Sequence, residues 1–125
     1  MGTGDGIWSY AADSGHLDGQ DLTGWSVAAA DGGTMGHVER AAAPHGMAHL
    51  VVDTGRWIFG HSAVVPAGVV AAVDRAARRI TLNCTRDQVK SAPGFRTDSE
   101  TFDPAYLATV GDHYLRTAPR GTTAG

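Results

Sequence analysis

The stretch from His49 to Pro93 constrains the fold more than any other part of this chain. Short apolar runs alternate there with glycine, proline, aspartate and asparagine about every ten residues. This spacing is typical of several short strands in a sandwich or a small barrel. The chain shows no equally dense pattern of catalytic residues, so its sequence indicates a fold more clearly than a chemistry.

The composition fits one domain that is rich in turns and strands. The chain has 125 residues, of which 17 are glycine and only 18% are charged, and a chain of this size can bury one hydrophobic core. Its net charge of -3 lacks the basic field of a nucleic-acid-binding protein. We therefore expect no nucleic-acid partner.

Cysteine usage and hydropathy indicate the compartment. Cys84 is the only cysteine, and a lone thiol fits a reducing cytoplasm. Residues 1–20 lack the basic start and apolar centre of a signal peptide. The longest apolar run, Ala63 to Val73, is interrupted by Pro66 and Gly68 and is shorter than the roughly 18 residues of a membrane span. We expect a cytoplasmic protein without a membrane span.

The apolar pattern predicts six strands and two helices. Predicted strands lie within residues 21–30, 35–42, 47–54, 62–65, 69–74 and 79–85, and the turn signal Asp31-Gly32-Gly33 joins the first two into a hairpin. Thr85 with Gln88 predicts a capping box and a short helix that stops before Pro93. Asp103-Pro104 predicts the start of a second helix, whose apolar stripe is Phe102, Tyr106, Leu107, Val110 and Tyr114.

This pattern divides the chain into three parts. Residues 1–20 are predicted to be a flexible N-terminal arm, residues 21–94 the barrel domain, and residues 95–125 a polar, partly helical extension with a frayed end. In the arm, Trp8 and Tyr10 are expected to be exposed or to dock on the barrel or on a partner.

The residues that could carry chemistry match no catalytic or metal motif. The chain has six histidines, at positions 16, 37, 45, 49, 61 and 113, and their spacing fits no zinc signature. Cys84 shares a strand face with Ile80 and Leu82, so we interpret it as a core residue. Asp53, Asp74 and Arg86 fall at strand ends, where turn formation competes with acid–base work as the explanation. We predict no catalytic, cofactor-binding or metal-ligating residue.

An interaction surface is the better candidate. Arg56, Trp57, Ile58 and Phe59 form a loop bracketed by two glycines, and Trp and Arg are common binding anchors. The competing explanation is that these large side chains close one end of a barrel. Trp8 and Tyr10 complete the candidate surface. Trp25 and Trp57 are expected to be shielded from solvent, and Trp8 is expected to be exposed.

Residues 21–94 resemble the PRC-barrel family, which includes the cytoplasmic domain of the photosynthetic reaction centre H subunit and small stand-alone bacterial proteins. The most specific parts of the likeness are Leu50 to Gly60, Pro66-Ala67-Gly68, Asp74, and Thr85 to Pro93. The resemblance implies an all-β fold, a small and strongly bent antiparallel sheet closed into a barrel. It implies no catalytic residues and no cofactor.

These observations lead to a non-catalytic adaptor or assembly module as the expected function. Such a module would mediate protein–protein interaction or self-association, for example as a homodimer, with a protein partner that the sequence does not identify. A small-ligand or metal-binding stress protein that uses the histidines is the alternative. A reaction-centre-like role that supports electron transfer is a third interpretation.

Overall fold

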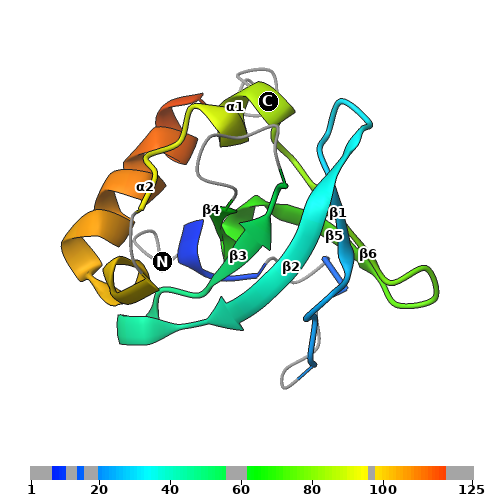
Figure 1. Cartoon of the computed structure of the whole chain (residues 1–125), viewed down its shortest axis with the longest axis horizontal. Helices are drawn as coiled ribbons and strands as arrows, with labels where there is room; N and C mark the ends of the chain where they lie inside the picture. The colour runs from blue at the N-terminus through cyan, green and yellow to red at the C-terminus, as the bar shows by residue number, and fades with distance from the viewer. Residues whose placement is uncertain (1–6, 11–13, 16–19, 56–61, 96–97, 118–125) are drawn as a thin grey trace.

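The computed structural model describes residues 7–10, 14–15, 20–55, 62–95 and 98–117. The described strands are β1 (Ser26–Ala28), β2 (Thr34–Ala42), β3 (His49–Asp53), β4 (Ser62–Pro66), β5 (Val70–Asp74) and β6 (Arg79–Leu82). The helices are α1 (Arg86–Lys90) and α2 (Pro104–Thr117), with short 3-10 turns η2 (Pro44–Gly46), η3 (Ala67–Val69) and η4 (Asp98–Phe102). In Figure 1, α2 lies at one end of the long axis and β1, β5 and β6 lie at the other.

The described strands form one mixed sheet in the order β4-β3-β2-β1-β6-β5. Every neighbouring pair is antiparallel except β1 and β6, which are parallel. The prediction of a wholly antiparallel sheet is therefore wrong at this pair. Hydrophobic alternation shows that a segment is a strand, but it does not show the direction of a neighbour that lies about fifty residues away.

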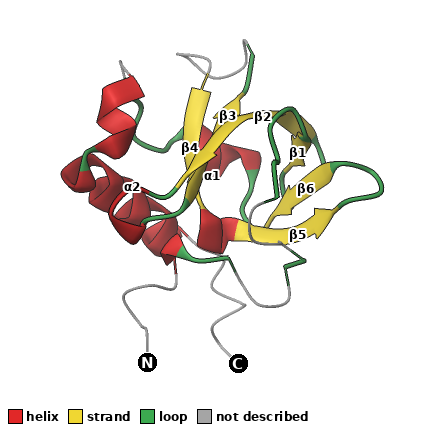
Figure 2. Cartoon of the chain, turned by 90° about the horizontal axis from the view of Figure 1, so that it is seen from below, coloured by secondary structure: helices red, strands yellow, loops and turns green. Residues whose placement is uncertain are grey.

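The connection between the two edge strands shows that the sheet is curled. Only η3 separates Pro66, at the end of β4, from Val70, at the start of β5. In a flat sheet of this order the two strands would lie about 24 Å apart, five intervals of about 4.8 Å. Four steps of about 3.8 Å between Cα atoms reach only about 15 Å. The sheet must therefore bend strongly to bring its two edges toward each other (Figure 2).

Each edge strand of the sheet forms a hydrogen bond with a residue outside the sheet. The hydroxyl of Tyr114 on α2 donates to the carbonyl of Val64 on β4 at 3.2 Å. At the opposite edge, the amide of Val73 on β5 donates to the carbonyl of Ser14 at 2.7 Å. An uncovered edge strand would invite pairing with another chain, and both described edges of this sheet have such contacts from outside it.

The core joins the concave face of the sheet to both ends of the described chain. Val27, Val52 and Ile80 are fully buried in one hydrophobic cluster. The same cluster contains Trp8 from the N-terminal part and Leu107, Val110 and Tyr114 from α2. The predicted apolar stripe of the second helix is thus confirmed at these three positions, whereas Phe102 is 46% exposed.

Two described residues of the N-terminal segment are buried. Trp8 is only 8% exposed and Ser14 only 3%, and the amide of Ala48 donates to the carbonyl of Trp8 at 3.1 Å. An aromatic side chain can bury a large apolar area, so one tryptophan is enough to hold a glycine-rich segment on the core. Trp25 is half-buried.

The local helix signals are confirmed. Gln88 donates its amide to the Thr85 hydroxyl at 3.2 Å, and its side-chain oxygen accepts from the Thr85 amide at 2.7 Å, which completes the predicted capping box. Asp103 accepts from the amide of Ala105 at 2.9 Å at the start of α2. Neither described helix is long and apolar enough to cross a membrane.

Candidate interaction face

The predicted interaction residues are not brought together by the part of the chain that the structure describes. Arg56, Trp57, Ile58 and Phe59 lie outside the described residues. Trp8 is buried against α2, so its predicted exposure is wrong. Tyr10 is half-buried and packs on the edge of the core, and this burial raises the pKa of its hydroxyl.

The described histidines lie on different elements and have different surroundings. His37 is exposed on β2, and His49 is fully buried on β3. Nε2 of His45 lies 3.2 Å from the carbonyl oxygen of Phe102, and Nε2 of His113 lies 2.7 Å from that of Gln88. Among the described residues, no group of three or more histidine, cysteine, aspartate or glutamate side chains could hold a metal ion. These histidines give the metal-binding alternative no support.

Cys84 is a core residue, as the strand pattern predicts. It is 2% exposed in the hydrophobic cluster, just beyond the end of β6. Burial, with a smaller contribution from the negative charge of Asp31, raises the pKa of the Cys84 thiol to about 12. The thiol is therefore protonated at neutral pH and is a poor nucleophile.

The aspartates at strand ends form turns. Asp53 accepts from the amide of Gly55 at 2.9 Å, and Asp74 accepts from the amide of Ala77 at 3.1 Å. These side-chain-to-backbone bonds confirm turn formation as the explanation for both residues. Arg86 lies with its guanidinium against Gly33 in the β1–β2 turn.

The strand register aligns a row of polar side chains from β4 to β5, and every member except His37 is the first or last residue of its strand. Each member is the direct partner of the next on the neighbouring strand, and none is buried. In order from β4 to β5, this polar row consists of Ser62, Asp53, His37, Ser26, Arg79 and Asp74. Directly opposite residues lie close enough for their side chains to interact.

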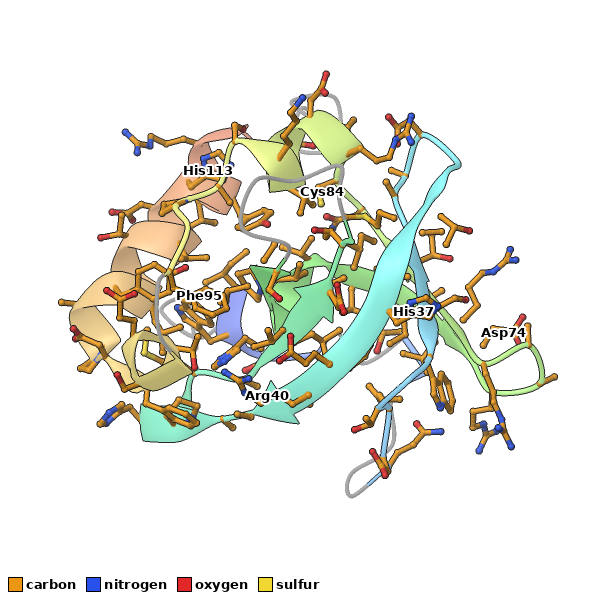
Figure 3. The ribbon with its side chains drawn as sticks, in the orientation of Figure 1. His37, Arg40, Asp74, Cys84, Phe95 and His113 are labelled. Carbon is orange, nitrogen blue, oxygen red and sulfur yellow. The ribbon has the colours of Figure 1, made fainter. Side chains whose placement is uncertain are left out.

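The residues next to the polar row in each strand point toward the core. Val27 pairs with Ile80, and Val52 pairs with Val38, and all four are buried. Because successive side chains alternate between the two faces of a strand, the buried pairs show that the polar row faces away from the core. Figure 3 shows two members of the row, His37 and Asp74, at the end of the molecule opposite α2.

An arginine-rich turn extends the polar row at the β5–β6 connection. We call Arg75, Arg78 and Arg79 the arginine turn; all three are exposed. Among the described residues, Arg40 forms an ion pair with Glu39 at 3.5 Å, whereas the arginines of the turn form none. The arginine turn therefore carries three positive charges, and the neighbouring described carboxylate is that of Asp74, which lies directly opposite Arg79 but forms no ion pair with it.

The backbone of the arginine turn is held in place. The carbonyl of Arg78 accepts from both the amide and the hydroxyl of Ser26, at 3.1 and 3.4 Å. Arg78 has a φ of 52°, a left-handed conformation that is uncommon for residues other than glycine, asparagine and aspartate. The turn is thus fixed to the polar row through Ser26.

The polar row and the arginine turn are absent from the sequence-based prediction. The segment Asp74 to Arg79 contains three arginines, and this local charge density is the signal that could have identified the turn. No comparable signal exists for the polar row, because its members come from six strands and are brought together only by the register.

A scan against protein-family models and a search of curated proteins each found no match to the chain.

Proposed function

We propose that this chain is a non-catalytic adaptor module with a PRC-barrel-like fold, which mediates protein–protein interaction or self-association in the cytoplasm. In this proposal the curled sheet closes into a small barrel. The strong bend imposed by the short β4–β5 connection supports closure, and so does the resemblance of residues 21–94 to the PRC-barrel family.

The observation that carries the proposal is the contrast between the buried sheet and its exposed polar row. α2 and Trp8 belong to the same core as the sheet, and β3 and β4 are buried on both faces, whereas the polar row and the arginine turn are accessible. Polar, charged surfaces of this kind are compatible with non-obligate interfaces, in which arginine is enriched. The polar row and the arginine turn are therefore the surface on which we place the partner.

The side chains that could have carried catalysis have structural roles, which supports a binding module over an enzyme. Cys84 is protonated in the core, and Asp53 and Asp74 hold turns. The proposal needs no reactive group, since an adaptor acts through its surface.

Affinity capture with the full-length chain tests this function. Tagged protein and an Arg75→Glu/Arg79→Glu variant are used as baits in lysate of the source organism, and light scattering coupled to gel filtration gives the mass of each in solution. We expect either specific preys or a defined oligomer for the unmodified chain, with loss of one of them in the variant. A monomer that captures the same background proteins as the variant would contradict the proposal.

The full chain is required in this experiment. Trp8 and α2 belong to the same hydrophobic cluster as the sheet, so a fragment limited to residues 21–94 would lose part of its core. Thermal unfolding of both baits is the folding control, and exposed substitutions away from special features are expected to change stability by no more than about 0.5 kcal/mol.

A further inference from the structure

We propose that the arginine turn, together with the Arg79 end of the polar row, binds an acidic segment of a partner protein through its carboxylates. This inference rests on the proposed function, because it names the partner chemistry of the same face. Two properties of the described residues carry it: the excess of positive charge in the turn and the way its backbone is held.

Three arginines of the turn outnumber the one carboxylate beside them, Asp74, which lies directly opposite Arg79. Exposed arginines commonly pair with carboxylates of their own chain, but among the described residues Arg75, Arg78 and Arg79 form no ion pair. Asp74, the nearest carboxylate in sequence, accepts a hydrogen bond from the amide of Ala77. Guanidinium groups bind carboxylates with two parallel hydrogen bonds, so the turn offers up to three such forks to an incoming acidic segment.

The backbone geometry presents these side chains from a fixed base. Arg78 occupies the left-handed region with a φ of 52°, where a glycine would fit without strain. Its carbonyl is held by two hydrogen bonds from Ser26, which ties the turn to β1. Strained residues that the surrounding structure holds in place are concentrated at functional sites, so an arginine at this position points to a role for its side chain.

The surroundings favour a short acidic protein segment over a nucleic acid. A nucleic-acid backbone requires a continuous path of positive charge, but Asp53 and Asp74 occupy the polar row on either side of Ser26 and Arg79. A compact group of carboxylates can contact the arginines without following the row past these aspartates.

Titration of the full-length, ¹⁵N-labelled chain with hexaglutamate, followed by the backbone amide signals, tests the inference. We expect the largest shifts at residues 74–79 and at Ser26, and weaker binding when sodium chloride is raised, because salt screens exposed charges. Loss of one hydrogen bond between charged groups typically weakens binding about tenfold. We therefore expect Arg75→Glu/Arg79→Glu to weaken binding by at least about tenfold.

A charge-matched variant separates the site from the overall charge. Lys90→Glu/Arg116→Glu alters the same number of charges at exposed positions on α1 and α2 and should leave hexaglutamate affinity within about twofold of the unmodified chain. Arg78→Gly removes one guanidinium while relieving the left-handed strain. It should raise the melting temperature and still weaken binding, which separates folding from recognition.

Several outcomes would overturn the inference. Equal loss of affinity in the two double variants would assign binding to net charge, and shifts confined to other residues would assign it to another surface. Tighter binding of a dodecathymidylate at the same residues would make a nucleic acid the partner. Shifts at the turn that depend on protein concentration alone would make a second copy the partner. Binding between two copies of the chain would leave the proposed function intact, because self-association is part of it, but would rule out an acidic foreign partner. The same holds if affinity capture recovers a specific partner while hexaglutamate does not bind the arginine turn.

Discussion

His49 is fully buried at the start of β3, and only one of its two ring nitrogens has a hydrogen-bond partner. Nδ1 lies 3.0 Å from the carbonyl oxygen of Met47, so it carries the proton and donates. Nε2 has no partner in the described structure. Burial, and secondarily the positive charge of Arg40, lower the pKa of His49 below its ordinary value of 6.5, against the opposing effect of the Met47 carbonyl.

This environment predicts that stability falls in mild acid. Between the lowered pKa and 6.5, the unfolded chain binds a proton at His49 that the folded chain does not, so the free energy of unfolding decreases as the pH falls through this window. Urea unfolding at several values from about pH 8 to about pH 5 measures the slope, and His49→Gln should reduce it.

Glutamine has no titratable group, so any slope that remains in His49→Gln comes from other residues. Equal slopes for the unmodified chain and His49→Gln would show that the acid sensitivity comes from other groups.

At the scale of single elements, the sequence predicts best what depends on a few neighbouring residues. The Thr85 capping box, the Asp103-Pro104 helix start and the turn at Asp31-Gly32-Gly33 are all observed, because each signal and its hydrogen bonds lie within a few residues. Along β2, strict alternation of side chains between the two faces does not predict which residues are buried. Met35 and Val38 are both buried, since the pairing with β1 shifts register between Val27 and Ala28 and a bulge changes which face a residue occupies.

Gly36 shows the same limit in β2. It pairs with Val27, and a Cβ atom at this position would overlap the carbonyl oxygen of Asp53 on β3. Sequence alone presents this residue as one of 17 glycines. Its role follows only from the close approach of two strands, in the same region that sets His37 opposite Asp53 in the polar row.

We predict that Gly36→Ala destabilises the chain by at least about 2–3 kcal/mol, because the β2–β3 pairing must open to admit the methyl group. Gly24→Ala is the control. Gly24 has a φ of 87° and no neighbouring atom within 4 Å of an added Cβ, so it should cost only the roughly 1–2 kcal/mol of a left-handed residue. Chemical denaturation compares the two variants, and equal losses would remove steric overlap as the cause.

At the scale of the whole molecule, one hydrophobic core contains residues from all three predicted parts of the chain. Trp8 packs on α2, about a hundred residues later in the chain, and α2 in turn covers the edge of β4. Sequence patterns identify an apolar stripe on α2, but they cannot identify which segment fills it. A glycine-rich segment with a single buried tryptophan has the composition of a disordered tail, so its docking becomes visible only in the folded chain.

The contact between Trp8 and Gly111 allows this joint core to be tested. An added Cβ at Gly111 would lie 2.9 Å from Cζ2 of the indole, so the helix carries a glycine where the ring lies against it. Glycine within a helix costs about 1 kcal/mol relative to alanine, and close packing of Trp8 offsets this cost. We predict that Trp8→Ala lowers the free energy of unfolding by about 3–5 kcal/mol, as for other buried tryptophans.

Whether Gly111→Ala stabilises or destabilises the chain should depend on whether Trp8 is present. In the unmodified chain, Gly111→Ala should be neutral or destabilising, because the indole must move. In the Trp8→Ala background the obstacle is gone, and the same substitution should stabilise α2 by about 1 kcal/mol. A double-mutant cycle measured by denaturant unfolding gives the coupling between the two residues. Additive effects would show that Trp8 does not rest on α2 in solution, and the N-terminal residues would then be independent of the core.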